Sequence, residues 1–194
     1  MTTATPTAQR QAGPPTFVLL VGLPGTGKST LARHIARHLP VEIVQTDAVR
    51  KALFPTPRYT PEEHQRVYET AHQIIEQLLF EQRNVVFDAT NLHESRRRAL
   101  YDIAANAQAN LVVVLTVAPP EVVRRRLDRR QRQRDAEDFS DATWEVYQRM
   151  SRELEPIPRP HLVVNTAVDL EPAVERILAL ARRPTAGEGG APRA

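Results

Sequence analysis

The stretch GLPGTGKST, residues 22–30, constrains the fold of this chain more than any other feature. It matches the pattern G-x-x-x-x-G-K-[ST] at every required position, behind the apolar run 17–21 and before a helical pattern. Glycines in such a loop let the backbone wrap around phosphate groups with its N–H groups pointing inward. The sequence therefore predicts a phosphate-binding loop between a buried strand and a helix.

The residues of this loop indicate a nucleoside triphosphate as the ligand. The Lys28 ammonium should reach the β- and γ-phosphates, and the Ser29 hydroxyl should bind Mg²⁺. The choice of lysine is informative, because all of the 26 Lys and Arg residues except Lys28 and Lys51 are arginines. We therefore expect ATP and Mg²⁺ as cofactors. The expected nucleotide-binding residues are Gly22, Pro24, Gly25, Thr26, Gly27, Lys28, Ser29 and Thr30.

Short apolar runs rich in β-branched residues alternate with helical patterns along the rest of the chain. Such runs suit strands that are covered on both faces. Their alternation with helices predicts a three-layer α/β fold with a parallel sheet between helices. The expected strands are 17–21, 41–45, 84–88, 110–117 and 161–165, and the expected helices are 29–39, 61–82, 95–107, 119–134, 141–154 and 171–182.

The two ends of the chain differ in composition from this alternating region. Residues 1–15 and 184–194 are polar and contain Pro and Gly, so we expect a disordered N-terminal arm and C-terminal tail around one domain, residues 16–183. The absence of cysteine excludes disulfides and thiolate metal sites. No apolar run reaches the roughly 18 residues of a membrane span, and the start lacks a signal-peptide centre. These features indicate a cytoplasmic protein with no membrane partner.

Asp47 and Arg50 follow the second expected strand. The carboxyl ends of parallel strands line one ligand crevice, so Asp47 should face the phosphate loop. Arg50 shares its face if Asp47 starts a helical turn. Asp47 would then take the proton of an acceptor hydroxyl as the catalytic base, and Arg50 would hold a phosphate or transition-state charge. Alternatively, Asp47 only caps a short helix and Arg50 points to solvent.

Asp88 ends the third expected strand, where a Walker B carboxylate holds Mg²⁺ directly or through water. Thr90 and Asn91 follow on the same edge, where they could hydrogen-bond an acceptor. The arginines 96–98 open the next helix, and at most one or two of them should point inward; we expect Arg97 to contact the acceptor. Alternatively, Asp88 is a helix N-cap and Asn91 a turn residue.

The run RRRLDRRQRQR, residues 124–134, is mostly arginine. Arg126 and Arg130 are four residues apart and share one helix face. We expect a lid at about 124–142 whose closure excludes water and brings one of these two catalytic arginines to the transferring phosphoryl group. Alternatively, the run is a solvated face or a basic patch for nucleic acid. No aromatic stacking pattern accompanies it.

Together these motifs resemble those of the polynucleotide-kinase-like P-loop kinases. The resemblance rests on GLPGTGKST, TDAVR (46–50), DATN (88–91) and the R-x-x-x-R of 126–130, and it runs from about Phe17 to Val164. The stretch TNLHESRR (90–97) is similar to the matching part of phage polynucleotide kinase. The stretch SDATWEVY (140–147) resembles the helix after the lid in small kinases, both stand-alone and linked to aminoglycoside phosphotransferases.

The resemblance implies transfer of the γ-phosphoryl group of ATP to a hydroxyl group. It implies that Lys28 and Ser29 hold ATP and Mg²⁺, with Asp47 as the general base. Arg50 would contact the acceptor or its phosphate, and Asp88 the metal or acceptor. Arg126 or Arg130 would be the lid arginine. The family also implies a sheet with the strand order 2-3-1-4-5.

The acceptor itself stays open at this point. Residues 51–81 match no pattern that identifies one, so a polynucleotide 5′-hydroxyl, a sugar, an antibiotic and a nucleotide-sugar are all candidates. Two other function classes are an ATPase or switch without a second substrate and a nucleic-acid-binding P-loop protein. The sequence counts against a GTPase-type switch, because no Asn-Lys-x-Asp motif is present.

Overall fold

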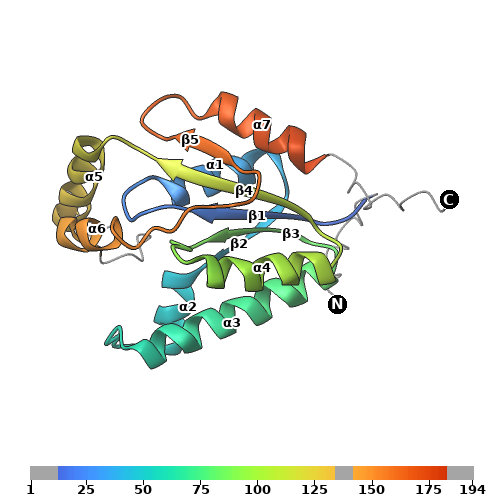
Figure 1. The fold of residues 1–194 in the computed structure, drawn as a ribbon, viewed down its shortest axis with the longest axis horizontal. Coiled ribbons are helices and arrows are strands. Elements are labelled where there is room, and N and C mark those ends of the chain that lie inside the picture. Colours follow the sequence, from blue (N-terminus) through green and yellow to red (C-terminus); the bar gives the residue numbers. More distant parts are fainter. Residues whose placement is uncertain (1–12, 134–141, 183–194) are drawn as a thin grey trace, which may run out of the picture.

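The computed structural model describes residues 13–133 and 142–182 of the chain. Its centre is one parallel sheet with the strand order β2-β3-β1-β4-β5, which confirms the predicted order (Figure 1). The strands are β1 (Thr16–Val21), β2 (Val41–Gln45), β3 (Asn84–Asp88), β4 (Asn110–Val117) and β5 (Leu162–Asn165). The helices are α1 (Lys28–His38), α2 (Thr46–Leu53), α3 (Pro61–Phe80), α4 (Glu94–Asn106), α5 (Pro120–Gln133), α6 (Trp144–Met150) and α7 (Glu171–Ala181).

Helices cover both faces of this sheet, as the apolar strands predict. Figure 1 shows α3 and α4 on one side and α1 and α7 on the other. Alternation along β1 supplies both layers, because Phe17 and Leu19 point to the α3–α4 side and Val18 and Leu20 to the α1–α7 side. The result is the expected three-layer α/β fold.

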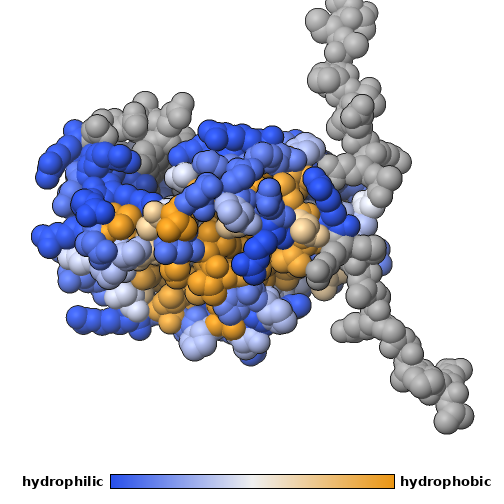
Figure 2. Space-filling model, turned by 90° about the horizontal axis from the view of Figure 1, so that it is seen from above, coloured by the Kyte–Doolittle hydropathy of each residue, from blue (hydrophilic) through white to orange (hydrophobic). Residues whose placement is uncertain are grey.

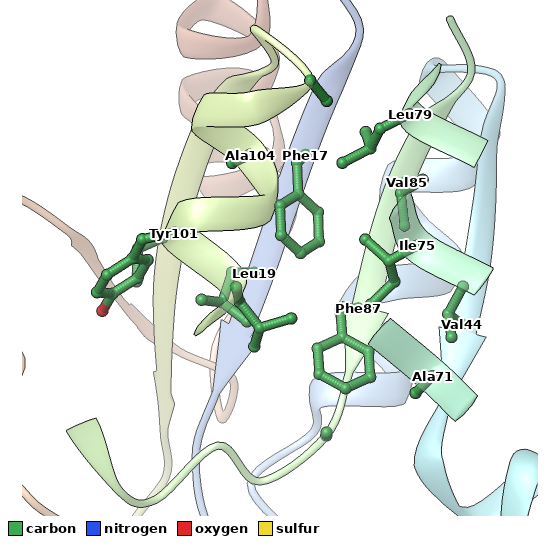
Figure 3. Close-up of a cluster of buried hydrophobic side chains, with 14 of the residues drawn as sticks. Phe17, Leu19, Val44, Ala71, Ile75, Leu79, Val85, Phe87, Tyr101 and Ala104 are labelled. Atoms are coloured by element: carbon green, nitrogen blue, oxygen red, sulfur yellow. The ribbon is translucent and has the colours of Figure 1, made fainter. Parts of the chain in front are cut away.

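Large apolar side chains fill the layer between the sheet and α3–α4. Phe17 and Leu19 meet Ile75 and Leu79 of α3 there, and Phe87 lies beside them (Figure 3). These side chains are fully buried, and each such burial contributes about 1.5–3 kcal/mol. This packing fixes α3 and α4 relative to the carboxyl ends of β1 and β3.

The helix starts follow local capping rules. The side chain of Thr60 accepts a hydrogen bond from the Glu63 N–H at 3.3 Å, and Pro61 stands in the first turn of α3, as predicted. The predicted helix 141–154 is shorter in the structure: α6 starts after its N-cap Thr143 and ends at Met150. The chain from 46 to 53, predicted only as a possible helical turn, forms the whole of α2.

The predicted arm lies almost wholly outside the described residues, as do the predicted tail and residues 134–141 of the predicted lid.

In the view from above, apolar side chains gather in the middle of the surface and hydrophilic ones surround them (Figure 2). Within the described ranges, no helix has the length and apolar character of a membrane span.

Candidate active site

The phosphate loop connects β1 to α1 through backbone conformations that glycine favours. Gly22 has a φ of 151°, and a Cβ atom there would lie 2.4 Å from Oγ1 of Thr116 on β4. Gly27 has a φ of 86° and is the N-cap of α1, so the loop leads directly into the positive end of that helix. The loop therefore has the geometry that a phosphate cradle requires.

Hydrogen bonds from three other segments hold the loop in place. The Gly22 N–H donates to the Thr90 carbonyl at 3.1 Å, which ties the loop to the chain after β3. Oγ1 of Thr26 lies 2.8 Å from Oγ1 of Thr116, and Oγ1 of Thr166 donates to the Thr26 carbonyl at 2.7 Å. Thr116 and Thr166 were not predicted from the sequence. The one signal that could have indicated them is their position, since Thr116 lies near the end of β4 and Thr166 directly follows β5.

Lys28 lies across this loop and is buried. Its Nζ donates to the carbonyls of Gly22 at 2.9 Å and Leu23 at 3.0 Å. Burial lowers the pKa of Lys28 below its ordinary value, while the carboxylates of Asp88 and Asp47 act in the opposite direction. These two carboxylates, from the ends of different strands, therefore share one electrostatic environment with the phosphate-loop lysine.

Asp88 and Asp47 reach this position from β3 and α2. Gln45, the last residue of β2, pairs in register with Asp88 and donates from Nε2 to its Oδ2 at 3.0 Å. Asp47 is in the first turn of α2, directly after the same strand, and its side chain is half-buried. Asp47 and Asp88 thus lie at the sheet edge that carries the phosphate loop, and their roles there stay predictions.

The remaining loop residues differ in exposure. Pro24 is buried, Ser29 half-buried and Thr30 exposed. The Ser29 hydroxyl and the Asp88 carboxylate would supply oxygen ligands, the type that Mg²⁺ prefers. No group of three or more His, Asp or Glu in the described ranges forms a metal cage. This donor set fits a Mg²⁺ ion held mainly by substrate phosphates rather than by protein alone.

Two residues expected to contact the acceptor have structural positions instead. Asn91 is fully buried with a φ of 49°, and its Nδ2 donates to the Leu20 carbonyl of β1 at 2.7 Å. Arg97 is also fully buried. Its guanidinium donates to the Glu94 carboxylate and to four carbonyls, those of Asn91, Leu92, Glu155 and Pro156.

These contacts correct the prediction for both side chains. All five N–H groups of the Arg97 guanidinium have protein acceptors, so none is left for an acceptor molecule. Arg97 instead joins the chain after β3 to residues 155–156. Thr90 remains half-buried beside Asp88, where its carbonyl supports the phosphate loop.

The two arginines of the predicted lid also differ. The guanidinium of Arg126 donates to the Gly25 carbonyl at 3.3 Å and to the Thr166 carbonyl and hydroxyl at 2.6 and 2.9 Å. It therefore braces the phosphate loop against the chain after β5. Arg130, one helical turn further along α5, lies close enough to Lys28 for its charge to lower the pKa of that lysine.

Arg50 is buried beside α3 rather than pointing to solvent. Its Nη2 lies 2.9 Å from Nδ1 of His64, and its Nη1 lies 3.7 Å from the Glu63 carboxylate. Its Nε and Nη1 make no hydrogen bond within the described part of the chain. The alternative of a solvent-facing Arg50 is thus wrong: Nε has no hydrogen-bond acceptor in the described ranges, and Nη1 has only the Glu63 carboxylate nearby.

Both the sequence and the fold of this chain are similar to those of known proteins. The family profile that matches residues 17–157 is that of AAA_33, an AAA domain. The chain belongs to this AAA domain family. The match begins at β1 and runs past α6, so it includes the phosphate loop, Asp47, Asp88 and both arginines of the predicted lid.

This AAA domain is similar in sequence to part of a tRNA kinase. L-seryl-tRNA(Sec) kinase of Methanococcus maripaludis is 30% identical over 115 residues, which cover 57% of this chain and 44% of that kinase. The chain thus matches less than half of the length of this relative.

Two solved structures share the fold. The APS kinase CysC of Mycobacterium tuberculosis, in complex with AMPPNP and APS, has a TM-score of 0.68 and 16% identity, covering 88% of this chain and 99% of its own. Kti12 of Chaetomium thermophilum, in complex with ADP-AlF3, has a TM-score of 0.69 and 19% identity, covering 84% and 95%. At these identities the likeness concerns the fold alone.

Proposed function

We propose that this chain is an ATP-dependent kinase that transfers the γ-phosphoryl group of ATP to a hydroxyl group of an acceptor. One observation carries the proposal: Asp88 ends β3 in register with Gln45 of β2, and Asp47 follows Gln45 in the first turn of α2, so two carboxylates lie at the sheet edge that carries the phosphate loop. A phosphate site alone needs no carboxylate on α2. A kinase needs one beside the γ-phosphate, where it can receive the acceptor proton. The kinases similar to this chain support the same reaction class.

In the proposed reaction, the loop and Lys28 hold the triphosphate while the acceptor hydroxyl approaches Asp47. The hydroxyl oxygen forms a bond to the γ-phosphorus as the bond to the β–γ bridging oxygen breaks, and ADP leaves. The hydroxyl proton moves to the Asp47 carboxylate. Mg²⁺, held by Ser29 and Asp88, would neutralise phosphate charge when bound. Arg130 is the better placed lid arginine to stabilise the transferring group.

The finer assignments remain part of this proposal. The domain would span residues 16–183, with a lid at about 124–142 that begins in α5. The acceptor would be the 5′-hydroxyl of a polynucleotide, as the polynucleotide-kinase-like subtype implies, or the hydroxyl group of a small molecule. Incubation with γ-labelled ATP and a panel of oligonucleotides, sugars, nucleotide-sugars and antibiotics tests the reaction directly. Labelled acceptor supports the proposal, and release of inorganic phosphate alone from every mixture contradicts it.

One observation favours nucleic acid as a ligand of the lid region. Trp144 and Tyr147 of α6 stack with ring centroids 4.9 Å apart, and Arg124 of α5 lies 5.7 Å from the Trp144 ring. From the sequence, no aromatic stacking pattern was expected beside the arginine run, and this contact corrects that expectation. Stacking rings beside arginines suit single-stranded nucleic acid. Affinity for a labelled oligonucleotide that falls steeply with salt and is weakened by Trp144→Ala supports this role; salt-independent or unchanged binding contradicts it.

A further inference from the structure

A second group of side chains lies next to the proposed reaction centre, between α2, α3 and α4. We call it the basic–aromatic cluster. Its members are Arg50 of α2, Tyr59 of the α2–α3 loop, His64, Tyr68 and His72 of α3, and Arg96 of α4. Figure 1 shows these three helices on the same side of the sheet. None of these side chains has a role in the reaction described above, although the family resemblance implies that Arg50 contacts the acceptor or its phosphate.

Arg50 forms one end of the cluster. Its side chain is only 4% exposed, and the ring of Tyr59 lies 4.9 Å from the guanidinium carbon. The nearest carboxylate, that of Glu63, accepts hydrogen bonds from the backbone N–H groups of Arg58 and Tyr59 rather than from Arg50. A buried guanidinium with Nε and Nη1 unbonded carries a desolvation cost that an oxyanion ligand would offset.

Arg96 forms the other end. Its guanidinium carbon lies 4.4 Å from the centroid of the Tyr68 ring, and within the described ranges it makes neither a hydrogen bond nor an ion pair. The neighbouring Arg98 is paired with Glu94 and is 75% exposed. A half-buried arginine that rests on an aromatic face keeps its N–H edge available for an anion.

The middle of the cluster is a row on α3. His64, Tyr68 and His72 are spaced by four residues, so they lie on one helix face. Tyr68 packs edge-on against Phe87 with ring centroids 6.3 Å apart, and Phe87 directly precedes Asp88. Tyr68 therefore places the middle of the row beside the carboxyl end of β3, where the proposed reaction takes place.

The charge within the cluster is positive, with the Glu63 carboxylate next to Arg50. Arg50 and Arg96 both lower the pKa of His64, with burial as the larger cause, and Glu63 opposes them. Burial and Arg96 likewise lower the pKa of His72. Since a guanidinium only donates, His64 Nδ1 must accept from Arg50, which fits a neutral ring. The two arginines thus supply the charge, and the neutral imidazoles supply further hydrogen-bonding atoms.

We propose that the basic–aromatic cluster binds an oxyanion carried by the acceptor, so that the enzyme selects alcohols bearing a phosphate or carboxylate group. This inference rests on the proposed kinase function. Arg50 and Arg96 bind the anion from two helices, while Asp47, three residues before Arg50, receives the hydroxyl. Neutral sugars leave both guanidinium groups unmatched, and cationic aminoglycosides are repelled.

Binding of a simple oxyanion tests this site without any need for turnover. With the phosphate loop saturated by a non-hydrolysable ATP analogue and Mg²⁺, inorganic phosphate is titrated while the His64 and His72 ring resonances are followed by NMR. We expect a saturable shift and a rise in the pKa of His64, because an anion favours the protonated ring. Arg96→Gln should weaken phosphate binding about tenfold or more. Arg98→Gln, two residues along α4, should bind phosphate as the wild type does.

Absence of a saturable shift, or an unchanged affinity in Arg96→Gln, overturns the oxyanion site. Arg50→Gln offers an independent variant if Arg96→Gln unfolds, with the same expectation of weakened binding. The test does not depend on the kinase activity. A bound phosphate with no phosphoryl transfer to any alcohol therefore contradicts only the proposed function.

The transfer assay then identifies the source of the anion. Matched pairs of alcohols, such as glycerol with glycerol 3-phosphate and glucose with gluconate, compare phosphorylated, carboxylated and neutral acceptors. We expect a preference of at least about tenfold in kcat/KM for the anionic member of a pair, and Arg96→Gln should reduce that preference mainly through KM. Equal or better use of the neutral members overturns the oxyanion site and leaves the kinase function standing.

Discussion

The phosphate loop and the basic–aromatic cluster meet at one sheet edge but are built in different ways. The loop is a continuous stretch whose backbone does the binding, and threonines from β4 and the chain after β5 brace it. The cluster consists of side chains from three helices, held mainly by ring contacts. Continuous backbone sites tolerate little change, whereas side-chain sites on helices can vary in specificity without loss of the fold.

The loop should dominate catalysis. Lys28→Ala removes the buried ammonium from the β- and γ-phosphates, and we expect phosphoryl transfer to fall about 10³- to 10⁵-fold, as for other cations that stabilise this reaction. Lys51→Ala, at the chain's other lysine, is the control and should retain ATP affinity. Steady-state kinetics and ATP titration measure both. Full activity in Lys28→Ala would remove the loop from the reaction.

Asp47 links the two regions, and its loss should affect chemistry but not ATP binding. For Asp47→Asn we expect kcat to fall about 10²- to 10⁴-fold, because the amide accepts no proton from the acceptor. The ATP dissociation constant should stay within about twofold of the wild type. A normal kcat in this variant would show that Asp47 is no base and that the two regions do not cooperate.

The neighbouring residues Arg96 and Arg97 differ in role. Arg96 belongs to the cluster, whereas Arg97 joins the chain after β3 to residues 155–156. Arg97→Ala removes the hydrogen bonds to the Glu94 carboxylate and to four carbonyls, of which those of Asn91 and Leu92 are buried, so we expect a loss of about 3–5 kcal/mol in the free energy of unfolding. Arg98→Ala, on the exposed side of α4, should lose less than about 0.5 kcal/mol. Urea unfolding measures both values; similar losses would contradict the structural role of Arg97.

The arginines of α5 should likewise differ in their effect on kcat. Arg130→Gln removes a charge that acts at Lys28, and we expect kcat to fall about tenfold to a hundredfold. Its neighbour Arg129 lies with Arg125, Asp128 and Arg132 along another side of α5, so Arg129→Gln should retain wild-type kcat. The ratio of the two kcat values is the measurement. Equal effects would indicate a general role of positive charge instead of a specific lid arginine.

The smallest expected effect concerns pH and the cluster. The lowered pKa of His64 means that the unfolded chain binds a proton more readily than the folded chain does. Stability should therefore decrease as the pH falls from about 6.5 through the lowered pKa, by at most about 1 kcal/mol because water screens this half-exposed ring. Urea unfolding between pH 7.5 and 5 should show a weaker pH dependence for His64→Gln than for the wild type; His161→Gln, at a half-buried histidine outside the cluster, is the control variant. Identical slopes in all three proteins would contradict the repulsion from Arg50 and Arg96.

The same comparison explains what the sequence could predict. The loop, the sheet order and the positions of Asp47 and Asp88 follow from local motifs or from the family resemblance, since strand ends in a parallel sheet meet at one edge. The roles of Asn91 and Arg97 could not be predicted in this way. Their partners, Leu20 and residues 155–156, are distant in the sequence. The stack of Arg96 on Tyr68 likewise depends on how α3 and α4 pack.

The central claim is that the loop and the Asp47 region form one phosphoryl-transfer site, and mass balance tests it most directly. Wild-type protein and Asp47→Asn are incubated with ATP, Mg²⁺ and the acceptor panel, and ADP, inorganic phosphate and phosphorylated alcohol are quantified by ³¹P NMR. We predict one phosphorylated alcohol per ADP with the wild type and a loss of this product with Asp47→Asn. ADP matched only by inorganic phosphate for every acceptor, at the same rate in both proteins, would contradict the claim.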